Sequence, residues 1–167
     1  IALTEPFLKR FEARFGCVPR DREATPLIQE APNMSSKIFV NLPVKDLNRS
    51  IEFFTRLGYT FNPQFTDENA TCMIVSDDIY VMLLVEKYFQ TFTPKTVADA
   101  KRTTEVLVAL SLDSREEVDR IVEAALAAGA GRYSEPKDHG FMYQWGFEDL
   151  DGHIFEYMWM DPATVQG

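Results

Sequence analysis

Several kinds of residue that mark particular protein classes are scarce in this chain. Its 167 residues include two cysteines, Cys17 and Cys72, which stand far apart and form no CxxC pair. The expected state is therefore two free thiols in a cytoplasmic protein. The apolar runs, such as residues 79–85, are too short to span a bilayer, so no membrane partner is expected. No secretory leader is recognisable at the start, although the chain does not begin with Met.

Basic residues are also scarce. The sequence has 17 lysines and arginines against 26 aspartates and glutamates, which gives a formal net charge of −9. Nucleic-acid binding needs clustered positive charge to displace counterions, and no such cluster is present, so no nucleic-acid partner is expected. The sequence also lacks a GxSxG nucleophile elbow, a Walker loop and a GxGxxG turn. The negative charge favours cationic ligands.

The first 33 residues differ from the rest in composition. Phenylalanines recur every four residues on one face of a predicted amphipathic helix over residues 5–15, at Phe7, Phe11 and Phe15. Residues 17–33 contain three prolines and scattered charges, which predicts a linker. Met34 resembles a natural start of translation. We therefore expect an N-terminal helix and linker over residues 1–33 and a folded domain over residues 34–167.

The hydrophobic pattern from Lys37 onward predicts one unit that occurs twice. In the first copy, a strand over residues 38–44 leads to a helix that Asp46 caps and Gly58 ends. Three short strands complete this copy, and the last of them ends at Val85.

A connector over residues 86–104, in which Thr93-Pro94 is expected to open a short helix, precedes the second copy. That copy begins with a strand over residues 105–112 and closes with a hairpin around residues 149–152. Two β-α-β-β-β modules, at about 37–86 and 105–162, predict an α+β fold built from an internal repeat.

These modules resemble the vicinal oxygen chelate superfamily of glyoxalases, bleomycin resistance proteins and extradiol dioxygenases. The segment LPVKDLNRSIEFFTRLGY is similar to the strand and helix signature of the family, and FEDLDGHIFEY is similar to its closing hairpin. The chain most resembles small bacterial proteins known as predicted lactoylglutathione lyases. The resemblance implies two βαβββ modules whose open, curled mixed sheet surrounds a central cleft. It also implies a homodimer.

In this family a divalent metal is held in the cleft by His and Glu side chains from four strands. The corresponding positions are Phe39, Met82, Leu107 and Glu156. Phe and Leu offer no lone pairs, and a Met thioether suits only soft ions. We therefore expect no metal and no cofactor. This departure argues against glyoxalase and dioxygenase chemistry, because both need the metal as a Lewis acid.

Glu156 is the leading candidate site residue. Side chains alternate on a strand, so Glu156 shares one face with Ile154 and Met158, and three aromatic residues occupy the other face. Glu156 is expected to be desolvated in the cleft, where it could act as a general base or hold a cation. The simpler interpretation is a glutamate hydrogen-bonded to Asn41 or to water. Asn41 itself needs a partner, either Glu156 or a ligand.

Other candidates are weaker. His139 could shuttle a proton at the cleft mouth, although a solvated loop histidine is the simpler interpretation, and His153 is expected to be structural. Tyr143 and Trp145 alternate on one strand and either form an aromatic cleft wall or pack in the core. Three aromatic residues of the connector could cover the cleft as a lid: Tyr88, Phe89 and Phe92.

The leading hypothesis is a metal-independent small-molecule-binding protein whose ligand is apolar or aromatic, and cationic if Glu156 holds it. The predicted binding residues are Phe39, Asn41, Met82, Leu107, Tyr143, Trp145 and Glu156. Two alternatives stay open. One is a metal-dependent lyase or isomerase of the glyoxalase type, or a dioxygenase, with an unrecognised ligand set and Glu156 as base. The other is an interaction module whose own N-terminal helix fills the cleft.

Overall fold

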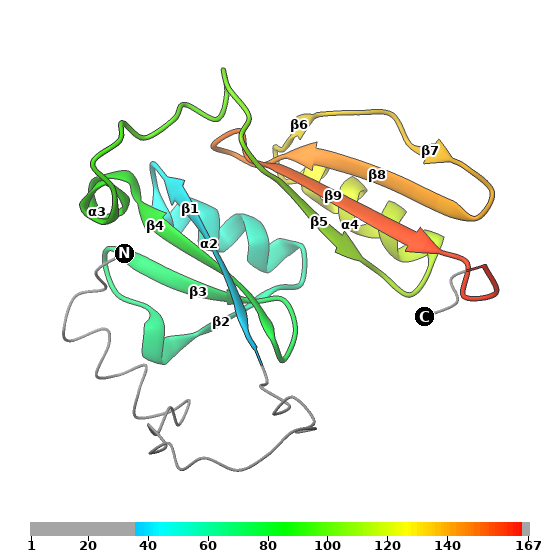
Figure 1. The fold of residues 1–167 in the computed structure, drawn as a ribbon, viewed down its shortest axis with the longest axis horizontal. Helices are drawn as coiled ribbons and strands as arrows, with labels where there is room; N and C mark the ends of the chain where they lie inside the picture. The colour runs from blue at the N-terminus through cyan, green and yellow to red at the C-terminus, as the bar shows by residue number, and fades with distance from the viewer. Residues whose placement is uncertain (1–35, 165–167) are drawn as a thin grey trace, which may run out of the picture.

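The structure, a computed structural model, describes residues 36–164 and contains two modules of related topology (Figure 1). The elements of the first module are β1 (Ile38–Val44), α2 (Leu47–Arg56), β2 (Thr60–Asn62), η1 (Pro63–Phe65), β3 (Ala70–Ile74) and β4 (Ile79–Val85). Its sheet has the strand order β1-β4-β3-β2. Strands β1 and β4 are parallel, and the other pairs are antiparallel.

The second module repeats this order with one additional short strand. Its elements are β5 (Leu107–Ser111), α4 (Arg115–Ala127), β6 (Gly131–Arg132), β7 (Lys137–Asp138), β8 (Met142–Glu148) and β9 (Ile154–Met160). The strand order is β5-β9-β8-β6, β7 also pairs with β8, and β5 is parallel to β9. The predicted α+β fold of two βαβββ modules is confirmed, with a separate mixed sheet in each module.

Equivalent local signals begin and end the two long helices. The Asp46 carboxylate accepts a hydrogen bond from the Arg49 N–H at 3.1 Å, and the Ser114 hydroxyl accepts one from the Glu117 N–H at 3.1 Å. Both side chains satisfy N–H groups that a helix start leaves unpaired. A glycine with φ of 101° follows the C-cap of each helix. This left-handed conformation stops the helix at little steric cost.

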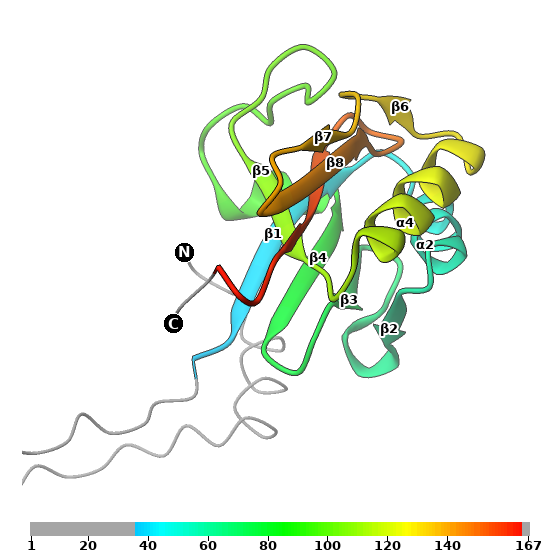
Figure 2. The same ribbon diagram turned by 90° about the vertical axis from the view of Figure 1, so that its right-hand side faces the viewer.

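Helices α2 and α4 lie side by side and cover the same side of both sheets (Figure 2). The main apolar core lies on this side and includes Phe54, Val118, Phe147, Phe155 and Tyr157, all of which are 0% exposed. The hydroxyls of Tyr59 and Tyr157 form a hydrogen bond of 2.9 Å between the modules. We call the opposite side of each sheet its inner face.

The connector differs from its prediction. The helical turns α3 (Glu86–Phe89) and η2 (Gln90–Phe92) come before Thr93-Pro94, so the expected helix start at Thr93 is wrong. Thr93 has extended backbone angles, φ −146° and ψ 140°. A residue before proline is disfavoured from helical angles by contact with the proline ring, which explains why the helix ends here.

The predicted helix and linker of residues 1–33 lie outside the described residues. Among the helices of residues 36–164, none is both long and apolar enough to cross a membrane.

Candidate functional site

The inner face of the first sheet is largely covered by the connector. Met82 lies on this face and is 3% exposed. Three aromatic residues of α3 and η2 pack over it: Tyr88, Phe89 and Phe92. The Phe39 ring stacks on Tyr80, with 4.8 Å between the ring centroids. The connector aromatics therefore lie where a lid was expected, and they bury much of this half of the cleft.

Asn41 is the exposed polar residue of β1 on the same face. Its side-chain amide donates to the backbone carbonyl of Phe39 at 3.2 Å. Neither partner considered from the sequence, Glu156 or a ligand, is needed to satisfy this group, because water can reach it.

The inner face of the second sheet is more open. The predicted alternation along β9 holds: Phe155 and Tyr157 are 0% exposed beneath the helices, and Glu156 lies on the other face. Glu156 is only partly buried, so the expected desolvation of its carboxylate is incomplete. On the side of β5 the neighbour of Glu156 is Ala109, which is too small to cover a carboxylate. On the side of β8 it is Gly146, and the Tyr133 ring lies over this glycine, with its Cδ1 3.3 Å from where a Gly146 Cβ would be.

Tyr143 and Trp145 lie on the helix side of the second sheet. The Tyr143 hydroxyl donates to the Asp119 carboxylate of α4 at 2.6 Å. Burial and this carboxylate raise the pKa of Tyr143 to about 12. The Trp145 indole N–H donates to the carbonyl of Ser134 at 2.9 Å. Of the two alternatives left by the sequence, core packing is therefore the observed one, because both side chains turn away from the face that carries Glu156.

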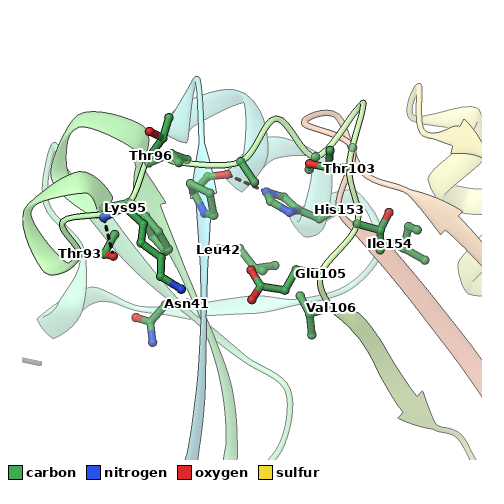
Figure 3. Close-up of a pocket in the computed structure, with 17 residues that line it drawn as sticks. Asn41, Leu42, Thr93, Lys95, Thr96, Thr103, Glu105, Val106, His153 and Ile154 are labelled. Carbon is green, nitrogen blue, oxygen red and sulfur yellow. Dashed lines mark hydrogen bonds between the residues drawn. The ribbon is translucent and has the colours of Figure 1, made fainter.

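A cavity of about 340 Å³ lies between the modules, where β1, the connector and the start of β9 meet (Figure 3). Its apolar lining includes Leu42, Phe89, Val97, Val106 and Ile154. Its polar lining includes Asn41, Thr93, Lys95, Glu105 and His153. Asn41 is the one predicted site residue in this lining. Glu156 lies close by, because it is two residues after Ile154 on the same strand face.

The closing hairpin of the second module fixes one wall of this cavity. Its Asp149 carboxylate is 4% exposed and accepts hydrogen bonds from the N–H groups of Asp151, Gly152 and His153 at 2.9, 2.8 and 2.8 Å. Burial raises the pKa of Asp149. The His153 ring Nε2 lies 2.7 Å from the Pro43 carbonyl and must donate to it, since a carbonyl only accepts. His153 thus has the structural role expected of it, and it also lines the cavity.

The remaining candidates lie elsewhere. His139 is exposed in the turn between β7 and β8, its backbone N–H donates to the Met142 carbonyl, and it does not line the cavity. Leu107 is 44% exposed at the start of β5. A second hollow of about 510 Å³ lies between Tyr59, Leu110 and Arg120 and includes none of the predicted site residues.

Sequence and structure comparisons identify the family. The model of the bleomycin resistance protein-like N-terminal family matches residues 37–76. The hypothetical protein SA1046 from S. aureus is 30% identical over 80% of this chain and 95% of its own, with a TM-score of 0.63. A glyoxalase/bleomycin resistance protein/dioxygenase from Nocardioides is 23% identical over 84% of this chain and 91% of its own, with a TM-score of 0.60. The chain belongs to the vicinal oxygen chelate superfamily.

A further member of this superfamily shows how widely the fold is shared. A family enzyme from Burkholderia phytofirmans PsJN is 17% identical over 73% of this chain and 96% of its own, with a TM-score of 0.62. No protein with a curated description matches the chain in sequence.

The residues at the superfamily's metal positions do not fit a metal. Phe39 is stacked on Tyr80, Met82 is buried under the connector, and Leu107 offers no lone pair. Glu156 alone could ligate. Within residues 36–164, no group of three or more His, Cys, Asp and Glu side chains is arranged to hold a metal ion.

Proposed function

We propose that the protein binds an apolar or aromatic small molecule, without a metal, in the cleft between its two modules. The observation that carries this proposal is the cavity of about 340 Å³ between β1, the connector and β9. Small-molecule pockets are commonly about 300 to 1,000 Å³, with mostly apolar walls and a few placed polar groups. The apolar walls here are suited to a ring system, and Asn41 supplies an amide at the edge.

Glu156 lies just outside the cavity lining, and its negative charge is proposed to attract a positive group of the ligand. The small Ala109 side chain leaves the Glu156 carboxylate uncovered on the side of β5, and the net charge of −9 attracts cations. Leu107 extends the apolar surface next to this carboxylate. Met82 belongs to the inner surface of the first sheet but is buried under the connector, so it contacts a ligand only if the connector moves. Phe39 is stacked on Tyr80 and lies outside the cavity lining. Tyr143 and Trp145 are not part of the proposed site.

The two other functions considered from the sequence have less support. A glyoxalase-type lyase or isomerase needs ligands that Phe39, Met82 and Leu107 do not provide. For an interaction module, the covering segment on the first inner face is the connector, through Tyr88, Phe89 and Phe92. The proposal includes a cytoplasmic location, in which the buried free thiol of Cys72 stays reduced.

Isothermal titration calorimetry with a matched pair of probes tests the proposal. Naphthylethylamine carries an aromatic body and a positive charge, and naphthylethanol has the same body without the charge. We expect both to bind the full chain in the presence of a chelator, with the amine tighter. In NMR spectra, the amides of Val106 and Ile154 should shift, and that of Glu123 on the outer side of α4 should not. Failure of both probes to bind at about millimolar concentration, or binding only after Zn²⁺ is added, would contradict the proposal.

A further inference from the structure

We infer that the ligand of this cavity is zwitterionic, with a carboxylate that pairs with Lys95 and an ammonium group that pairs with Glu105. This inference rests on the proposed function, because it names the ligand class of the same cavity. Lys95 and Glu105 are the lining residues that carry a full charge. Figure 3 shows both side chains reaching into the cavity from opposite sides, with Leu42 and Val106 nearby.

Both charged groups are available to a ligand. The ion pairs recorded for residues 36–164 join Lys37 to Asp78, Arg115 to Asp138 and Arg132 to Glu135. Neither Lys95 nor Glu105 takes part in them, and no side-chain hydrogen bond within this part of the chain uses either group. The other titratable residue of the lining, His153, already donates to the Pro43 carbonyl.

The backbone around Lys95 is held in place before any ligand binds. The Lys95 N–H donates to the Thr93 hydroxyl at 3.2 Å. The Lys95 carbonyl accepts from the Gln90 side-chain amide at 2.7 Å, and the same amide donates to the Thr93 carbonyl at 2.8 Å. These bonds fix the turn that presents Lys95 to the cavity, which reduces the ordering cost of binding.

The sign of the two charges restricts the ligand. A ligand with only a positive group would pair with Glu105 but would bring its charge towards Lys95. A ligand with only a negative group would pair with Lys95 but would bring its charge towards Glu105. A neutral ligand would displace water from both charged groups without replacing the hydrogen bonds that the water made to them. A ligand with both charges avoids these costs, and its apolar body can lie on Leu42, Val106 and Ile154. An aromatic amino acid or a compound derived from one has this chemistry.

Three probes with one aromatic body test the inference. Naphthylalanine is a zwitterion, naphthylethylamine is a cation, and naphthylpropionate is an anion. We expect naphthylalanine to bind the full chain most tightly in calorimetric titrations. Lys95→Gln should weaken naphthylalanine and naphthylpropionate by up to about fivefold, the range of solvent-accessible ion pairs, and should leave naphthylethylamine unchanged or tighter. Glu105→Gln should weaken naphthylalanine and naphthylethylamine by a similar factor and should leave naphthylpropionate unchanged or tighter.

Two kinds of control separate pairing from a general disturbance. Lys87→Gln and Glu123→Gln remove the same charges at exposed positions outside the cavity and should leave all three affinities unchanged. The exchange variant Lys95→Glu with Glu105→Lys should recover most of the preference for naphthylalanine, because a zwitterion can bind in the reverse orientation.

The outcomes distinguish this inference from the proposed function. If naphthylalanine binds no more tightly than naphthylethylamine, or if Lys95→Gln changes all three affinities equally, the zwitterion assignment is wrong and small-molecule binding still stands. If none of the three probes binds, the proposed function itself fails.

Discussion

Because Glu156 is only partly buried, its charge should contribute moderately to the free energy of ligand binding. We predict that Glu156→Gln weakens naphthylethylamine binding by up to about fivefold, because Gln keeps the shape and removes the charge. A fully buried pair would cost about 3 kcal/mol when broken, but this carboxylate is only partly buried, beside the small Ala109. Titration calorimetry measures the change, with Glu123→Gln as the matched control. Equal affinities for both variants and the wild type would show that Glu156 does not contribute to binding.

A second residue gives the protein a defined alkaline sensitivity. Burial raises the pKa of the Cys72 thiol from 9.0 to about 11. An unfolded chain releases this proton near pH 9, whereas the folded protein keeps it to near pH 11. The stabilisation of the folded state by the protonated thiol is therefore complete below pH 9 and is lost as the pH rises to 11. We predict that this loss reaches up to about 3 kcal/mol of the free energy of unfolding.

Urea unfolding at about pH 8 and about pH 11 measures the effect of Cys72. The variant Cys72→Ala has a small cavity that lowers stability at both pH values, but it has no thiol to titrate. The wild type should therefore lose more stability between the two pH values than Cys72→Ala does. Equal losses would show that the thiol is not responsible.

The residue-scale predictions from the sequence succeeded where they depended on strand alternation alone. Alternation placed Glu156 opposite Phe155 and Tyr157 correctly, because each side of a strand is set by local geometry. It could not predict the exposure of Glu156, which depends on neighbours contributed by β5 and β8. It also could not tell which face of β8 packs on the helices; in the structure this is the face of Tyr143, whose hydroxyl donates to the Asp119 carboxylate of α4.

At the scale of the elements, the closing hairpin around residues 149–152 packs against the connector, and this contact shapes the cavity. Gly152 has a φ of 100°, and a Cβ there would lie 2.7 Å from the Lys101 backbone nitrogen. We predict that Gly152→Ala destabilises the protein and weakens probe binding, since it adds left-handed strain and also forces the connector away. Gly58→Ala is the matched control, because Gly58 has a φ of 101° and open space around its Cβ position.

Thermal unfolding and titration of the two glycine variants give the comparison. Gly58→Ala should cost about 1 kcal/mol from backbone strain and leave binding unchanged. Gly152→Ala should cost clearly more and change the affinity as well. If the two variants are equally stable and bind equally well, the contact between hairpin and connector does not shape the cavity.

The connector also shows why element boundaries near the site were hard to predict. Thr93-Pro94 was interpreted as a helix start, but the residue before proline resists helical angles, and here the chain ends η2 at that point. The same two residues fit both interpretations. The choice depends on α3 and η2 packing their aromatic residues on the first sheet, a contact between segments distant in sequence.

For the whole molecule, the internal repeat was the most informative sequence feature. Capping residues such as Asp46 and Ser114, with glycines after the helices, recur in both halves and are local signals, so the two-module fold followed from them. The cavity was not predictable in this way. Lys95 comes from a connector without periodicity, whereas Glu105 and Val106 were predicted in the strand over residues 105–112 but come just before β5. Only the path of this segment between the modules brings the three residues together. The division into an extension over residues 1–33 and a domain over residues 34–167 stays a prediction.

The open inner face of the second sheet predicts that the protein is a homodimer. Met160 is 37% exposed on this face, at the end of β9 farthest from Ile154 and Leu107, and apolar area of this kind is costly to leave in water when it is contiguous. Sedimentation velocity at micromolar concentration should therefore give a dimer mass. Met160→Glu should raise the dissociation constant by more than about tenfold, because the new carboxylate would be buried without a partner. Ala127→Glu adds the same charge at an exposed position on α4 and should leave the dimer intact. A monomeric wild type would contradict the prediction, and a Met160→Glu variant that dimerises as tightly as Ala127→Glu would place the interface elsewhere.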